Sequence, residues 1–130
     1  MRVSYVCLDP GVPVFGAKGA SVHVQEVVRA LRRAGHEVVL HAARRGGLVP
    51  ADLADLTVVE TPVRTGDPAG RERAQAEASR RAARDVLERG ADLVYERYSL
   101  FSTALADVAR AAGAPGVLEV NAPLIDEDRK

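Results

Sequence analysis

The sequence predicts an α/β domain built on a doubly wound parallel sheet, and two patterns in its 130 residues support this. Short apolar runs rich in β-branched residues alternate with longer segments whose apolar residues recur at helical spacing. The runs are almost continuously apolar, as expected of strands buried on both faces of a sheet. Right-handed connections then favour the strand order 3-2-1-4-5 and a Rossmann-like arrangement.

Five apolar runs, each short and bounded by turn-forming residues, are the predicted strands. They cover residues 2–8, 37–43, 56–61, 92–97 and 116–120. The segment 44–47 between the second and third runs contains two glycines and predicts a loop without a helix. Helices are predicted over residues 20–34, 68–89 and 100–112.

The first predicted helix has the clearest amphipathic pattern. Val24, Val28 and Leu31 belong to its apolar stripe, while Gln25 and the charged residues beside it are expected to face water. Gly35 follows the last turn, where glycine commonly ends a helix. This helix is therefore expected to cover one face of the sheet.

The second and third predicted helices have weaker signals. Asp67 and Gly90 are the expected N-cap and terminator of the second, whose apolar face is thin. Val86 and Leu87 anchor its second half, so the first half is expected to protrude, fray or meet a partner. Ser99 is the expected N-cap of the third helix.

Composition excludes several classes of function. The formal net charge is zero, which predicts no bulk attraction to nucleic acid or to acidic membranes. Cys7 is the only cysteine, so an intrachain disulfide is impossible. No cluster of Cys, His and carboxylate residues has metal-ligand spacing. No apolar segment approaches the ~18 residues of a membrane span. We expect a cytoplasmic protein, one that could also lie peripherally at the inner face of the membrane.

A glycine-containing loop follows the first predicted strand and leads into the first helix. Free backbone N–H groups and the helix dipole make such a junction suited to anions. The spacing of Gly11, Gly16 and Gly19 is too wide for a dinucleotide fingerprint. A Walker A loop also fails, because Ala17 displaces the lysine and a glycine follows Lys18. Two readings remain: a mobile loop through which backbone and Lys18 approach an anion, or a plain connection.

Polar residues also follow the fourth and fifth predicted strands. In an open parallel sheet, ligands bind beyond the carboxyl ends of the strands, at the point where the strand order reverses. The candidates there are Glu96, Arg97, Tyr98, Ser99 and Asn121.

The charged candidates of these strands have structural alternatives. Glu96 and Arg97 form either an ion pair with each other or a contact to a sugar or phosphate. Glu119 lies within a strand and is either paired or on an edge. His23, near the start of the first helix, is more readily structural or solvated than a ligand.

Four segments in order resemble one known family. They are residues 16–24 (GAKGASVHV), 35–38 (GHEV), 94–101 (VYERYSLF) and 118–124 (LEVNAPL). Together they resemble the N-terminal half of retaining glycosyltransferases of the GT-B fold, family 4 type. The resemblance extends over nearly the whole chain.

That resemblance implies an acceptor-side domain that faces a second, donor-binding domain across a cleft. It implies a nucleotide-diphosphate sugar as donor, no cofactor and no required metal. Gly16 and Gly19 would face the donor phosphates with Lys18 nearby, and the candidates from Glu96 to Asn121 would line the cleft. Tyr98 and Asn121 stand near positions where many members have histidine, so no catalytic residue is assigned.

The resemblance also sets expectations for organisation and partners. Residues 1–125 would form the Rossmann-like acceptor-side domain, residues 126–130 a charged tail, and the donor-binding domain would be absent, leaving this chain inactive alone. The acceptor would be a small molecule or a glycan. The alternative is a non-catalytic Rossmann-like binding or assembly module, and a homodimer could form through an exposed sheet edge or helix 68–89.

Overall fold

The computed structural model describes residues 1–64, 68–97, 107, 113 and 115–119. Strands and helices alternate along this part of the chain. In chain order they are β1 (Arg2–Cys7), α1 (Gly19–Arg33), β2 (Glu37–Ala42), the 3₁₀ helix η1 (Ala51–Leu53), β3 (Thr57–Glu60), the 3₁₀ helix η2 (Pro68–Gly70), α2 (Arg71–Arg89), β4 (Leu93–Arg97) and β5 (Gly116–Glu119).

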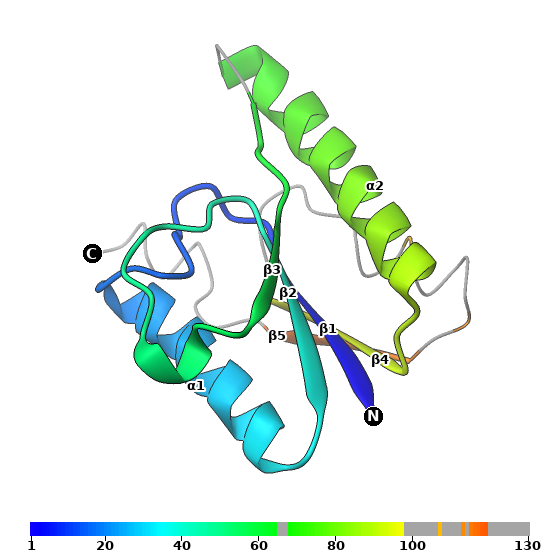
Figure 1. The fold of residues 1–130 in the computed structure, drawn as a ribbon. Helices are drawn as coiled ribbons and strands as arrows, with labels where there is room; N and C mark the ends of the chain where they lie inside the picture. Colours follow the sequence, from blue (N-terminus) through cyan, green and yellow to red (C-terminus); the bar gives the residue numbers. More distant parts are fainter. Residues whose placement is uncertain (65–67, 98–106, 108–112, 114, 120–130) are drawn as a thin grey trace.

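The five strands form one parallel sheet in the order β3-β2-β1-β4-β5 (Figure 1). The predicted fold class and strand order are therefore confirmed. β1 is central, and its Val3 pairs with Val38 of β2 on one side and Leu93 of β4 on the other. The order reverses between β1 and β4, so the loop after β1 and the end of β4 meet at the same edge of the sheet.

Helices α1 and α2 pack on opposite faces of the sheet (Figure 1). Alternation along β1 explains this arrangement, because successive side chains of a strand point to opposite faces. Tyr5 and Cys7 join the apolar cluster that includes Val24 and Val28 of α1. Val6 joins the cluster formed with residues of α2. The sheet is thus doubly wound, as its near-continuous apolar strands predict.

Most predicted boundaries agree with the structure to within one or two residues, and the exceptions are local. Residues 44–47 form no helix, as predicted, but further along the same connection Ala51–Leu53 forms a 3₁₀ turn that buries Leu53. A second such turn, Pro68–Gly70, precedes α2, which begins at Arg71. The predicted third helix and its cap Ser99 lie outside the described residues, apart from Asp107 and its end near Gly113.

Two predictions about which residues face the core are wrong. Gln25 was expected to face water but is 7% exposed, because it packs against the loop after β1. Leu87 was expected to anchor α2 but is 39% exposed. Small side chains on the adjoining face of α2, including Ala78 and Ala82, are buried instead. A face of alanines lets the helix approach the sheet closely. The sequence pattern did not indicate this, because alanines contribute little to an apolar stripe.

The first half of α2 is also held against the rest of the fold, like its second half. Gln75 is buried and donates a hydrogen bond of 2.7 Å to the carbonyl oxygen of Leu8, and Ser79 is fully buried. The N-terminal end of α2 extends beyond the carboxyl ends of the strands (Figure 1). Within the part of the chain that the structure describes, no helix has both the length and the apolar character that crossing a membrane requires.

Candidate functional site

The loop between β1 and α1 begins with a tight turn. The carboxylate of Asp9 accepts a hydrogen bond of 2.9 Å from the N–H of Gly11, and its backbone carbonyl accepts one of 3.0 Å from Val12. A short side-chain acceptor that closes its own turn is typical of Asp before Pro-Gly. The turn directs the chain back across the sheet edge, and Val14 and Phe15 become buried.

The middle of the loop is tied to the segment that follows β2. The N–H groups of Val14 and Phe15 donate to the carbonyls of Arg44 and Arg45, at 3.0 and 2.8 Å. Phe15 forms a parallel bridge with Gly46, and the Arg45 guanidinium lies 5.1 Å from the centre of the Phe15 ring. The loop, for which the sequence left a mobile loop and a plain connection as alternatives, is therefore held on this side by backbone hydrogen bonds.

Side chains of α1 hold the same loop from its other side. Ser21 donates a hydrogen bond to the carbonyl of Pro13. Gln25 donates through Nε2 to the carbonyls of Val14 and Gly16, at 2.8 and 3.2 Å. A Cβ on Gly16 would lie 2.9 Å from the Ser21 hydroxyl, so glycine is required for this close approach. The sequence pattern missed these contacts because a polar residue in a helix usually faces water.

A row of free donors begins where the loop meets α1. The six consecutive backbone N–H groups from Gly16 to Ser21 have no acceptor among the described residues. Lys18 is the N-cap residue, and no side chain caps the helix and no acidic residue occupies its first turn. The helix dipole adds positive potential at this end. These features together form a site suited to an anion such as a phosphate.

The predicted loop residues Gly16, Lys18 and Gly19 therefore lie at the start of α1. Lys18 and Gly19 are exposed. A Cβ on Gly19 would meet nothing within 4 Å, so packing does not explain the glycine. A glycine with open space in front of it lets another group approach the backbone closely.

A second polar cluster joins α1 to the ends of β4 and β5. The Glu119 carboxylate accepts a hydrogen bond of 2.6 Å from the Tyr95 hydroxyl and lies 3.0 Å from Nε2 of His23. Arg97, its register partner in β4, lies 3.5 Å from the same carboxylate. Burial, followed by the hydrogen bond to Glu119, raises the pKa of Tyr95 to about 12. Neither His23, Tyr95 nor Glu119 was predicted as a site residue.

Tyr5 lies beside this cluster in the central strand. Its ring centre is 5.2 Å from that of Tyr95, and its buried hydroxyl has no hydrogen-bond partner among the described residues. Burial, with a further contribution from Glu119, raises the pKa of Tyr5 well above its ordinary value. Residues two apart in a strand point to the same face, so the sequence could have indicated that Tyr95 and Arg97 of β4 lie together. Their partner in β5 could be identified only from the strand register.

The ion pair at the end of β4 joins Arg97 to Glu119. Glu96, one residue earlier, is buried at 3% exposure on the other face of the strand. Of the predicted site residues, Arg97 ends β4, while Lys18 and the glycines lie where the loop after the neighbouring strand β1 meets α1. The other predicted residues, Tyr98, Ser99 and Asn121, lie outside the described part of the chain.

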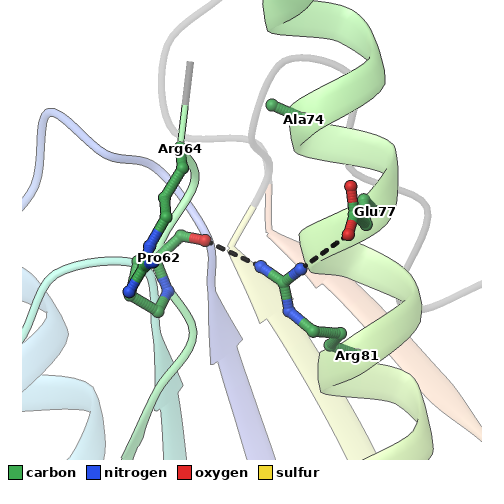
Figure 2. A pocket seen from close by; sticks show the side chains of 5 residues that line it. All are labelled: Pro62, Arg64, Ala74, Glu77 and Arg81. Carbon is green, nitrogen blue, oxygen red and sulfur yellow. Dashed lines mark hydrogen bonds and ion pairs between the residues drawn. The ribbon is translucent and has the colours of Figure 1, made fainter. Parts of the chain in front are cut away.

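A cavity of about 400 Å³ lies between the segment after β3 and α2 (Figure 2). Arg81 spans it, with hydrogen bonds to the Glu77 carboxylate at 3.1 Å and the Pro62 carbonyl at 2.9 Å. None of the predicted site residues lines this cavity. Among the described residues, no group of three or more His, Cys, Asp or Glu side chains could hold a metal ion.

Comparison with solved structures supports the fold. Two crystal structures of the C-terminal domain of a Pyrococcus furiosus hydrogenase have TM-scores of 0.63 and 0.64 to this chain. They cover 91% and 92% of this chain and 90% of their own, at 14% sequence identity. At this identity the likeness concerns the fold alone. No curated protein matches the sequence.

The sequence also matches the profile of a protein family. The family described as Glycosyltransferase Family 4 matches residues 17–124, a stretch that begins at the row of free N–H groups and continues past Glu119. The match spans well over half of the chain and includes α1, α2 and every strand except β1. The family match and the sheet topology agree, and the chain belongs to Glycosyltransferase Family 4.

Proposed function

We propose that this chain is the acceptor-side domain of a retaining glycosyltransferase that uses a nucleotide-diphosphate sugar. The observation that carries the proposal is the row of six free N–H groups at the uncapped start of α1. Family membership supports sugar transfer as the reaction class. The position of the row, at the carboxyl edge of a parallel sheet beside the strand-order reversal, supports it as a ligand site.

The chemistry follows from the charge that develops during transfer. As the bond between the sugar and the diphosphate breaks, negative charge grows on the leaving phosphate oxygens. Fixed backbone donors, the dipole of α1 and the Lys18 ammonium would stabilise that charge without rearranging. The acceptor, a small molecule or a glycan, would bind near Arg97 and the other predicted residues at the ends of β4 and β5.

A site of this kind needs a second domain to hold the nucleotide and the sugar. The proposal therefore expects no turnover from this chain alone. It also expects inorganic pyrophosphate to bind the chain about as well as UDP or GDP, because nothing in the proposed site contacts a base. Binding at the start of α1 would be weak, on the order of millimolar.

A charge-reversal pair tests the phosphate role. Lys18→Glu places a negative charge at the N-terminus of α1, while Arg33→Glu makes the same change at its exposed C-terminus. Titration with inorganic pyrophosphate, followed by ¹⁵N amide shifts, is expected to show about tenfold weaker binding for Lys18→Glu. Arg33→Glu should stay within about twofold of the wild type.

The amide shifts also locate the bound anion. Shifts concentrated in residues 16–21 of the wild type support the proposal. If those amides do not respond to pyrophosphate, or if both variants weaken binding equally, the start of α1 does not hold the donor phosphates.

The second candidate is an assembly module, and the observation that favours it lies on β5. Val117 and Leu118 are 43% and 48% exposed on this strand, which pairs with β4 alone among the described strands. An exposed apolar edge strand invites pairing with a second copy of the chain. The outer side of α2 is mostly charged, so β5 is the better candidate than helix 68–89.

Sedimentation velocity tests self-association directly. The assembly proposal expects a concentration-dependent dimer that is lost in the double variant Val117→Lys, Leu118→Lys, because lysines on an edge strand oppose pairing. A monomer at every concentration up to several hundred micromolar would rule it out.

A further inference from the structure

The loop before α1 has its carbonyl groups and its N–H groups held by different neighbours. The carbonyls of Pro13, Val14 and Gly16 accept hydrogen bonds from side chains of α1. The N–H groups of Val14 and Phe15 donate instead to the segment after β2. The loop is therefore clamped between these two segments, with each peptide unit turned in a defined direction.

Gln25 makes two of the three contacts from α1. Both of its acceptors are backbone carbonyls, so the side-chain amide must present its NH₂ group to them. The residue is 7% exposed, and at least one of its bonds is fully buried. Removing the NH₂ group would leave two loop carbonyls without this donor, which is unfavourable in a buried setting.

The bond from Gln25 to the Gly16 carbonyl also fixes the next N–H group. The Gly16 carbonyl and the Ala17 N–H belong to one peptide unit, and the described peptide bonds are all trans. In a planar trans unit the C=O and N–H bonds point in opposite directions. With its carbonyl turned toward Gln25, this unit directs the Ala17 N–H away from α1, where the described residues offer it no acceptor.

We infer that Gln25 is a positioning residue that aims the Ala17 N–H, and the row of donors after it, at the diphosphate. The inference rests on the proposed function for its ligand, but its geometric part does not depend on that function. Gln25 touches no substrate in this scheme. It acts through the Gly16 carbonyl, by holding one peptide unit in the orientation that an anion requires.

A matched pair of variants separates positioning from general stability. Gln25→Met keeps the length and removes both donors, and Gln25→Glu serves as a second variant that cannot donate when ionised. Gln75→Met is the control, because Gln75 is also buried and also donates to a backbone carbonyl, that of Leu8 directly after β1. Urea unfolding of each variant measures the loss of stability that the Gln25 and Gln75 substitutions have in common, because each removes a buried hydrogen-bond donor.

Two NMR measurements then report the orientation of the Ala17 N–H and the affinity for pyrophosphate. Residual dipolar coupling of the Ala17 N–H in the free protein is expected to change in the Gln25 variants and to be unchanged in Gln75→Met. Titration with inorganic pyrophosphate is expected to show the Ala17 amide shift strongly in the wild type. In the Gln25 variants we expect about tenfold weaker binding and loss of that response.

The outcomes distinguish this inference from the proposed function. An Ala17 coupling that is the same in the wild type and the Gln25 variants overturns the positioning role, whatever pyrophosphate does. Equal pyrophosphate affinity in the wild type and the Gln25 variants overturns it as well. A changed coupling in a protein whose wild type does not bind pyrophosphate supports the geometric role of Gln25 and removes the phosphate role of the loop.

Discussion

Gly46 adopts a φ angle of +76°, and a Cβ at this position would lie 2.5 Å from the carbonyl oxygen of Phe15. Both facts arise from the bridge between the loop after β1 and the segment after β2. A residue with a side chain would be strained in this backbone region and would push the two segments apart. The next residue, Gly47, meets neither constraint, since a Cβ there has nothing within 4 Å.

These adjacent glycines give a prediction at the residue scale. Gly46→Ala is expected to lower the free energy of unfolding by about 2–4 kcal/mol, from backbone strain together with overpacking. Gly47→Ala should change it by no more than about 0.5 kcal/mol. Urea unfolding measures both. Equal effects of the two substitutions would show that the bridge to Phe15 does not constrain the loop.

At the scale of elements, β5 depends on side-chain contacts because the strand itself is short and exposed. Only its last residue, Glu119, is partly buried. That carboxylate links β5 to β4 and α1, because it contacts Tyr95 and Arg97 of β4 and His23 of α1. A carboxylate that accepts a short hydroxyl hydrogen bond and lies beside a guanidinium is among the stronger polar contacts of a protein.

Two neighbouring tyrosines, the partly buried Tyr95 and the fully buried Tyr5, test the contribution of this carboxylate. Tyr95→Phe removes the 2.6 Å bond to Glu119 and is expected to lower the free energy of unfolding by about 1–2 kcal/mol. Tyr5→Phe removes a buried hydroxyl that has no hydrogen-bond partner in the described part of the chain, so it should be neutral or raise stability by up to about 1 kcal/mol. Chemical unfolding at constant pH measures both. A loss in Tyr5→Phe as large as in Tyr95→Phe would contradict the assignment of the bond.

At the scale of the whole molecule, one buried histidine couples stability to pH. His41 of β2 is fully buried, and its Nδ1 lies 3.5 Å from the carboxylate of Asp85 on α2. Burial lowers the pKa of His41 to about 4; Asp85 opposes this shift and Arg89 adds to it. Desolvation outweighs the carboxylate, so His41 is neutral at neutral pH and the contact with Asp85 is not an ion pair there.

The lowered pKa sets the direction of the pH dependence. The unfolded chain takes up a proton on this residue below about pH 6.5, while the folded chain does so only near pH 4. Protonation therefore favours the unfolded state across this window, and the stability is fully present above it. The contribution is on the order of 3 kcal/mol at the acid end.

His41→Leu is expected to remove this part of the pH dependence. The free energy of unfolding of the wild type, minus that of the variant, should fall as the pH drops from about 6.5 to 4. Urea unfolding across this range gives the difference directly. His36→Gln, which changes a histidine near the surface, is the control and should keep the slope of the wild type. A constant difference for His41→Leu would show that His41 is not the titrating group.

The sequence predicted the elements better than it predicted the contacts among them. Val24 and Val28 lie on the core face of α1, as their spacing indicates, because periodicity records which side of a helix is apolar. Gln25 is buried beside them because a neighbouring loop supplies two carbonyls, which no helical pattern can record. The role of Leu87 was misjudged for a related reason: the alanines of α2 form the buried face by close approach.

Some parts of the candidate site could likewise be predicted from the sequence, and others could not. The glycine loop and the end of β4 were found from the sequence, since strands, loops and the reversal of strand order follow from local pattern and the handedness of connections. Glu119 could be joined to Arg97 only once the register of β4 and β5 was known. His23 could be joined to them only once α1 was placed on that face.

The sequence by itself determined the parallel sheet, its strand order and the loop that meets α1, because burial on both faces and right-handed crossovers leave few alternatives. The tertiary structure alone decided which backbone groups of that loop are free, through Gln25, Ser21 and the bridge to Gly46. The physical reason is that hydrogen-bond partners distant in the chain depend on ångström-scale approach. Hydrophobic spacing indicates which face of a helix or strand is apolar, but not the atoms that its residues contact.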